Sequence, residues 1–184
     1  MSIRNQNFIQ ETDRIVSAVS VVVNNIKSNP DDSIATFKAS AKLEEGLISK
    51  INIRQFQIYS DEPPRLGGND QGPNPVELVL GALAACQEIV IKAYASVLGI
   101  CVDSIHVETK GNLDLRGFFN LANIRAGFHH VEYITTITTS EQDKEKLAQL
   151  VYFAESRCPV LDILQNHVHV EGSFKFVETK ELVS

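Results

Sequence analysis

The chain contains three cysteines, and their settings decide what thiol chemistry it could perform. Cys86 lies in the middle of a long apolar run, Cys158 precedes a proline, and Cys101 begins a strand-like stretch. A thiol serves redox chemistry when it forms a thiolate and a second thiol captures the oxidised sulfur as a disulfide. Cys86 and Cys158 fall on two separate predicted elements, which such a bond would join. The alternative is that each is a buried structural cysteine, the commoner fate of any single free thiol.

The remaining candidate ligands lack the spacing of a metal site. Neither a CxxC nor an HxxxH pair occurs in the chain, and these are common ligand spacings. His167 and His169 alternate in a strand-like run and therefore share one face, where a metal would need a third ligand. Structural histidines are the commoner case, so we predict no metal and leave any role of the two histidines open.

Composition and charge exclude several classes of protein. The 184 residues, 43% of them hydrophobic, fit one compact domain or a domain with an appendage. A net charge of -6 without a basic stripe argues against nucleic-acid binding. The N-terminus does not resemble a signal peptide, and the central apolar run is interrupted by Glu77, Glu88 and Lys92, which a bilayer penalises. We expect a cytoplasmic protein with neither a nucleic-acid nor a membrane partner.

The first third of the chain predicts a helix followed by strands. Apolar residues between about Asn7 and Lys27 recur at the spacing of one helical stripe, and a Ser-Asn-Pro-Asp-Asp run ends it. We therefore divide the chain into an N-terminal helical extension, residues 1–30, and a main domain, residues 31–184. Short strand-like runs follow from Ile34 to Ser60, with Glu44-Glu45-Gly46 as a turn, and predict an antiparallel meander.

A proline- and glycine-rich loop, DEPPRLGGNDQGPNP, leads into the central helix. Asn74 is a natural N-cap and Pro75 suits the first helical position. Glu77 lies where a carboxylate favours the positive end of the helix dipole. The helix should run to about Leu98, before Gly99.

The second half of the chain predicts two long strands, a second helix and a closing strand. The strands are the runs CVDSIHVETKGNL and FHHVEYITTITT. The helix is predicted to start at Ser140 as N-cap and to break at Arg157-Cys158-Pro159, because proline disfavours helical conformation in the preceding residue. A short helix, VLDILQ, and a last strand, HVHVEGSFKFV, follow. The order indicates an α+β fold in which two helices pack against curved antiparallel sheets.

Two motifs together resemble one known family. The run DEPPRLGGNDQGPNPVELVLGALAACQ and the later SRCPV are similar to the osmotically inducible protein C (OsmC) and organic hydroperoxide resistance (Ohr) family. In that family a glycine-rich loop with an Asn-Pro pair precedes a helix carrying the first cysteine, and a Cys-Pro pair carries the second. The resemblance covers about Ile34 to Val177. The loop is more similar to the non-Ohr, OsmC-like branches.

The resemblance implies an OsmC-like fold and an obligate, intertwined homodimer with thiol sites at its interface. It implies reduction of organic hydroperoxides, with Cys86 as the peroxidatic and Cys158 as the resolving cysteine. The sulfenic acid formed on Cys86 would condense with Cys158 into a disulfide. The resemblance implies no bound cofactor but an external dithiol reductant, often a lipoylated protein in this family.

The acidic and apolar candidates for the site are chosen by their positions on the central helix. The family's catalytic glutamate directly follows the Asn-Pro pair, where this chain has Val76, so Glu77 is a conditional substitute. Nine residues of helix place Glu77 on the opposite side from Cys86, so it cannot touch the thiol of its own chain. Leu83 and Val90 share the stripe of Cys86 and are candidate substrate-binding residues.

The activating cation is the main departure from the family pattern. A rough alignment places Glu44 where the well-characterised peroxidases have their catalytic arginine. The alternative cations are Arg54, Arg65, Arg125 and Arg157. Arg157 is the simplest choice, as a substrate-binding residue, because it neighbours Cys158. A solvated arginine that favours the helix C-terminus is an equally good interpretation of Arg157.

Three functions therefore remain open. The leading hypothesis is a thiol-dependent peroxidase for small organic hydroperoxides. The main alternative is an OsmC-like dimer that keeps both thiols but binds or processes another apolar or electrophilic molecule, since the usual arginine is missing. The third is a redox sensor whose N-terminal helix holds a partner, although its apolar stripe could equally pack on the same dimer.

Overall fold

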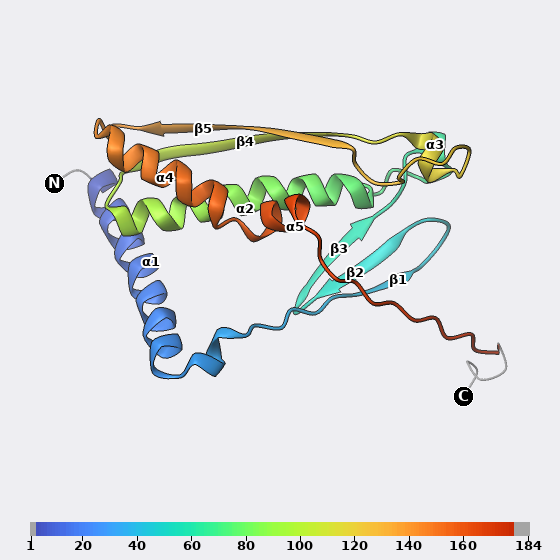
Figure 1. Ribbon diagram of the computed structural model, residues 1–184, viewed down its shortest axis with the longest axis horizontal. Coiled ribbons are helices and arrows are strands. Elements are labelled where there is room, and N and C mark those ends of the chain that lie inside the picture. Colours follow the sequence, from blue (N-terminus) through green and yellow to red (C-terminus); the bar gives the residue numbers. More distant parts are fainter. Residues whose placement is uncertain (1–2, 179–184) are drawn as a thin grey trace.

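The computed structural model describes residues 3–178 and has an α+β architecture (Figure 1). The helices are α1 (Ile3–Ser28), α2 (Pro75–Leu98), α3 (Leu115–Phe118), α4 (Lys144–Ser156) and α5 (Pro159–Gln165). Two 3-10 turns are η1 (Pro30–Ser33) and η2 (Pro64–Leu66). The strands are β1 (Ser40–Leu43), β2 (Ser49–Ile53), β3 (Phe56–Ser60), β4 (Val102–Asn112) and β5 (His130–Thr139). The predicted fold class is confirmed.

The core forms where α2 and α4 pack beneath the long antiparallel ribbon of β4 and β5 (Figure 1). Its buried members are apolar residues from α2, β4, α4 and the turn after α2: Ile91, Ala95, Ile100, Val102, Leu150 and Ala154. Tyr94 of α2 stacks on Phe153 of α4 with ring centroids 4.3 Å apart. This packing holds α2 in a fixed position, so the other side chains of the helix are held in place as well.

Helix α2 begins and ends with strong local signals. The Asn74 side chain accepts a hydrogen bond from the Glu77 N–H at 2.9 Å, and the Glu77 carboxylate accepts one from the Asn74 N–H at 2.8 Å, which is a complete capping box. Gly99 ends the helix at φ 67°, a left-handed conformation that suits glycine. The predicted cap and bounds of the central helix are confirmed.

The loop before α2 is organised around the buried carboxylate of Asp61. That carboxylate accepts hydrogen bonds from three backbone N–H groups, those of Glu62, Asn69 and Gln71, at 2.8, 2.9 and 3.3 Å. Burial acts to raise the pKa of Asp61, but these backbone donors outweigh it and the pKa is lowered. Gly68 is required for space, because a Cβ there would collide with the Glu62 carbonyl. The loop therefore has a specified backbone conformation.

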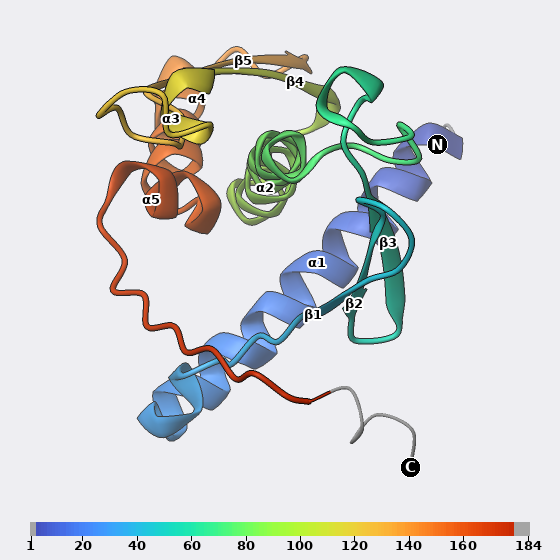
Figure 2. The ribbon, with the colours of Figure 1, turned by 90° about the vertical axis from the view of Figure 1, so that its right-hand side faces the viewer.

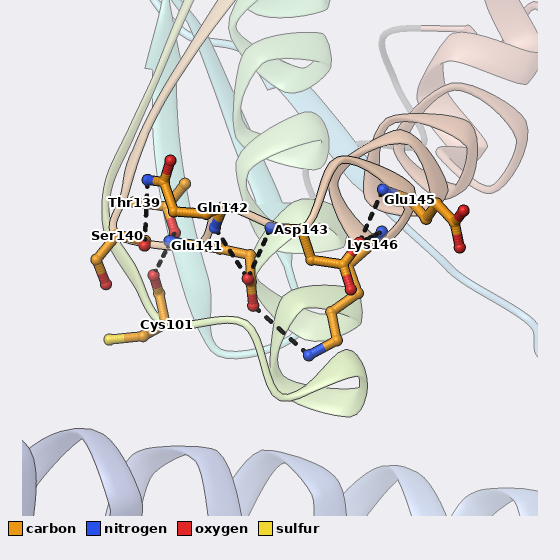
Figure 3. A network of polar contacts seen from close by, with 8 residues as sticks. All are labelled: Cys101, Thr139, Ser140, Glu141, Gln142, Asp143, Glu145 and Lys146. Atoms are coloured by element: carbon orange, nitrogen blue, oxygen red, sulfur yellow. Dashed lines mark hydrogen bonds and ion pairs between the residues drawn. The ribbon is translucent and has the colours of Figure 1, made fainter.

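Helix α4 starts later than the sequence predicts, and Ser140 is not its cap. The N-cap is Asp143, whose carboxylate accepts hydrogen bonds from the N–H groups of Glu145 and Lys146 (Figure 3). The preceding residues form a turn in which the Glu141 carboxylate accepts from Gln142 and Asp143 (Figure 3). The predicted N-cap was wrong because this turn uses the residues from 140 to 142 before the helix can begin.

The sheet β1–β2–β3 stands away from the helices and confirms the predicted meander (Figure 2). Gly46 turns the chain between β1 and β2 at φ 59°. The predicted strand at residues 34–43 is shorter than expected, since β1 begins only at Ser40. Its four residues are all exposed, so one edge and much surface of this sheet are uncovered in the single chain.

The predicted closing strand at residues 167–177 is wrong for the single chain. These residues follow α5 as an exposed segment without strand pairing (Figure 1). A strand needs a neighbouring edge to satisfy its backbone groups, and the described part of this chain offers none beside this segment.

Helix α1 packs on α2 through its first half. Lys92 of α2 forms an ion pair with Glu11 at 3.1 Å and lies over the ring of Phe8. The second half exposes a row of valines. No helix among residues 3–178 is long and apolar enough to cross a membrane.

Candidate active site

Two cysteines that are 72 positions apart in the sequence are in contact in the fold. The Cys158 thiol donates a hydrogen bond to the Cys86 sulfur, with the sulfur atoms 3.1 Å apart. Cys86 comes from the middle of α2, and Cys158 is the N-cap residue of α5, held there by Pro159 in the first helical position. Both thiols are free, so the pair is a dithiol.

The two thiols differ in exposure. Cys158 is 1% exposed, whereas Cys86 is only partly buried. Burial raises the pKa of the Cys158 thiol, and its hydrogen bond to Cys86 raises it further. The backbone N–H groups of Leu161 and Val160 act in the opposite direction but do not reverse the shift. Cys158 therefore stays protonated at neutral pH, as a donor to Cys86.

The dithiol lies in a small apolar cluster. Leu83 and Leu161 are buried beside Cys158, and Cys86 packs against them. The partly buried side chains that complete the cluster are Val90, Val131, Tyr133 and Val160. Such surroundings shield the Cys158 sulfur from water, whereas Cys86 stays partly exposed.

A cavity of about 310 Å³ adjoins this cluster and shares Leu83, Val131, Tyr133 and Leu161 with it. The other walls come from the loop after α3, from the start of β5 and from the end of α5. The cavity therefore offers a small molecule a place next to the apolar cluster that holds the thiols, although neither cysteine is among its lining residues.

Glu77 does not lie at the dithiol. Its carboxylate is engaged in the capping box of α2 and is exposed, nine residues before Cys86 on the same helix. Within one chain it stabilises the helix start, as its geometry on the helix predicts.

The other predicted residues divide into two groups. Leu83, fully buried, and Val90 pack in the thiol cluster. Arg157 is the exposed C-cap of α4, one residue before Cys158, and its N–H donates to the Phe153 carbonyl. Glu44 lies in the turn after β1, on the sheet that stands apart from the thiols.

Sequence reasoning missed Tyr133 of β5. This side chain packs beside the thiols and also lines the cavity. Burial raises its pKa, and the nearby charges of Glu155 and Cys158 add to the effect. The signal that could have found it is the alternation along β5, in which Val131 and Tyr133 face inward.

The remaining candidate metal ligands, Cys101 and His169, do not belong to the thiol cluster. Cys101 is joined to β5 by its carbonyl, which accepts a hydrogen bond from the Thr139 hydroxyl at 2.6 Å (Figure 3). His169 contacts Glu171 at 3.1 Å in the exposed C-terminal segment. Within residues 3–178, no group of three histidine, cysteine or acidic side chains is arranged to hold a metal ion.

Comparison with known proteins identifies the family. Residues 67–173 match the family model described as OsmC-like protein, which is more than half of the chain, so the protein belongs to the OsmC-like family. The matched segment contains both thiols of the pair. The resemblance predicted from the sequence is confirmed, and so is the OsmC-like fold.

Individual relatives are distant. The chain is 26% identical over 110 residues to the uncharacterized protein YmaD of Bacillus subtilis, covering 59% of this chain and 71% of that protein. An OsmC-like protein from Mycoplasma pneumoniae matches with a TM-score of 0.60 at 20% identity, over 71% of this chain and 88% of the other. An organic hydroperoxide resistance protein OsmC from Legionella pneumophila matches with a TM-score of 0.52 at 21% identity, over 72% and 90%. The family suggests a role in oxidative or osmotic stress.

Proposed function

We propose that this protein reduces organic hydroperoxides with Cys86 as the peroxidatic and Cys158 as the resolving cysteine. The observation that carries the proposal is the free dithiol, with sulfur atoms 3.1 Å apart and with Cys86 partly exposed in an apolar cluster that a cavity adjoins. Family membership and the hydroperoxide resistance protein among the structural relatives support it.

The first step is attack by the Cys86 thiolate on the distal oxygen of the hydroperoxide. The O–O bond breaks, the sulfur gains that oxygen as a sulfenic acid, and the alkoxide leaves and takes a proton to become an alcohol. Cys158 assists because its S–H bond is directed at the sulfur where the negative charge of the thiolate resides.

The second step closes the disulfide. The Cys158 sulfur attacks the Cys86 sulfenic acid, an S–S bond forms, and water leaves with the proton from Cys158. A disulfide bond is about 2.05 Å long, so the two sulfur atoms need to approach by roughly 1 Å. No rearrangement of α2 or α5 is required for so small a movement.

An external dithiol completes the cycle. Its thiolate attacks the Cys86–Cys158 disulfide, and its second thiol resolves the mixed disulfide, so that the reductant leaves oxidised and both cysteines recover their thiols. A lipoylated protein is the reductant class that the family suggests. The reaction needs no bound cofactor.

The functional unit is a homodimer. The single chain leaves large apolar side chains exposed on its sheet and extensions, among them Phe37, Phe174 and Phe176 at 92, 93 and 96%. Apolar surface on this scale is typical of an interface. A second chain would cover it and would give residues 167–177 a strand edge on which to pair.

In the proposed dimer, the second chain also supplies the positive charge that the Cys86 thiolate lacks within the described part of one chain. Within the described residues, the Cys86 sulfur contacts the Cys158 thiol and no cation. The uncovered sheet carries Lys50 over the ring of Tyr59 and Arg54 over the ring of Phe56. In the proposed dimer, a cation from this sheet of the second chain is the candidate to stabilise the attacking thiolate.

Because no cation contacts the Cys86 sulfur within the described residues of the single chain, a second candidate function is also favoured. Without a positive charge, the apolar cluster around Cys86 suits a dimer that binds or modifies another apolar or electrophilic molecule. An apolar electrophile can react with a thiol without a peroxide bond to cleave.

Turnover separates the two functions. The full-length protein is mixed with cumene hydroperoxide and dihydrolipoamide, and loss of hydroperoxide is followed against a sample without protein. The peroxidase predicts sustained, catalytic loss. Loss at the rate of the protein-free sample would leave only the second candidate.

A further inference from the structure

The cavity beside the dithiol has two chemically different walls. Apolar side chains form the wall near the thiols and along α5: Leu83, Phe128, Val131, Leu161 and Leu164. The polar part of the lining includes Arg125 and His129 from the loop before β5 and His130, the first residue of β5. A ligand that fills this cavity would have an apolar body and a group that a cation can bind.

The positive charge of Arg125 is available to such a ligand. The two carboxylates nearest to the cavity histidines already have cations of their own: Glu132 pairs with Lys110 at 3.0 Å, and Asp114 pairs with Arg116 at 2.6 Å. The Arg116 hydrogen bond lowers the pKa of Asp114 to about 2, so that pair remains charged. Among residues 3–178, Arg125 has no carboxylate partner.

The guanidinium of Arg125 has the geometry that a carboxylate requires. A guanidinium presents parallel N–H donors that match the two oxygens of a carboxylate, and such charge-assisted pairs are stronger than neutral hydrogen bonds. His130 contacts Glu132 at 3.9 Å on the exposed face of β5, so Arg125 is the cation that the cavity offers. A neutral hydroperoxide would leave this guanidinium unused.

The size of the cavity limits the ligand. At about 310 Å³ it lies at the lower end of the roughly 300–1,000 Å³ typical of small-molecule pockets. A compact ligand fits within it, whereas a long acyl chain would extend into solvent.

We propose that the preferred substrate is a compact organic hydroperoxide that carries a carboxylate, which Arg125 binds while the peroxide faces the dithiol. This inference rests on the proposed function for the reaction, but recognition of the carboxylate is a separate property of the cavity. Arg125 is thus a specificity-determining residue and takes no part in electron transfer.

The kinetic test compares two substrates that share one reacting group. They are 4-carboxycumene hydroperoxide and its methyl ester, with dihydrolipoamide as reductant and kcat/KM as the readout. The full-length protein should prefer the acid by about tenfold, the scale of one charge-assisted pair. Arg125→Gln should bring the ratio of the two values close to one, because the acid loses its cationic partner. Arg125→Lys should restore part of the preference, because it keeps the charge without the planar fork.

A matched control is Lys144→Gln, which removes an exposed cation at the start of α4, at the far end of the molecule (Figure 1). It should preserve the acid preference. An acid-to-ester ratio near one in the unaltered protein, or an equal loss with Lys144→Gln, would overturn the inference.

A binding experiment keeps the inference testable if the peroxidase itself fails. The probe is 4-isopropylbenzoate, which has the carboxylate and no peroxide, compared by calorimetry with the neutral 4-isopropylbenzamide. The benzoate should bind the unaltered protein and bind Arg125→Gln about tenfold more weakly. Equal binding of benzoate and benzamide, or benzoate binding unaffected by Arg125→Gln, would refute carboxylate recognition. No turnover of either hydroperoxide, with the benzoate still bound through Arg125, would refute the proposed function alone.

Discussion

The Cys158 thiol donates a hydrogen bond to the Cys86 sulfur across 3.1 Å, from the cap of one helix to the middle of another. The direction of this contact matters because it pairs a buried donor with a partly exposed acceptor. It gives two chemically identical side chains different surroundings, and the predictions about the proposed roles of the thiols follow from this difference.

Serine substitutions should separate the two roles. Cys86→Ser should lower hydroperoxide turnover to the protein-free rate, because the proposed peroxidatic nucleophile is removed. Cys158→Ser should allow one rapid reaction per site and then stop, because the sulfenic acid has no resolving thiol. Dimedone labelling of Cys86, detected by peptide mass spectrometry, reports that trapped acid. Cys101→Ser is the control and should retain full turnover.

Alkylation should also distinguish the thiols. Because Cys158 is 1% exposed and burial raises its pKa, iodoacetamide at pH 7.5 should modify Cys86 faster by on the order of tenfold. Peptide mapping over time gives both rates. Raising the pH to 9.5 should narrow the difference, since more of Cys158 then ionises. Faster modification of Cys158 at pH 7.5 would reverse the assignment of roles.

Asp61 should make the loop before α2 sensitive to acid. Its pKa is lowered in the folded protein, so its charged form contributes stability above the unfolded value of about 3.9. That contribution is lost as the pH falls through the lower folded value. Asp61→Asn should therefore lower the melting temperature at pH 7, and the gap should narrow below about pH 4. The exposed Asp31→Asn control should melt like the unaltered protein at both pH values.

The exposed C-terminal segment should be part of the dimer. Phe174 and Phe176 are almost fully exposed in the single chain, so burying them against a second chain is favourable. Sedimentation should show a dimer for the unaltered protein and a shift toward monomer for Phe174→Ser combined with Phe176→Ser. The exposed Lys144→Gln should leave the dimer unchanged. A monomeric unaltered protein would contradict the proposed assembly.

Local sequence signals were sufficient for much of the fold. Asn74, Pro75 and Gly99 fix the central helix because each acts through its own backbone and nearest neighbours. The same reasoning failed at Ser140, because the Glu141 carboxylate competes for the backbone of the following residues and delays the helix to Asp143.

Long-range relationships were harder to predict. The strand expected at residues 167–177 has the right alternation, but pairing depends on an edge that the sequence pattern cannot locate. At the site, the two cysteines could be chosen by their settings and by family resemblance. Tyr133 and the cavity could not, because they arise where α5 and β5 meet in space.

The central claim is tested most directly by mass spectrometry of the thiols after peroxide. The reduced, full-length protein is mixed with one equivalent of cumene hydroperoxide per chain, alkylated and digested. The account predicts loss of two hydrogen atoms per chain and a peptide that links Cys86 to Cys158, with Cys101 alkylated. Unchanged thiols, or a disulfide through Cys101, would contradict it.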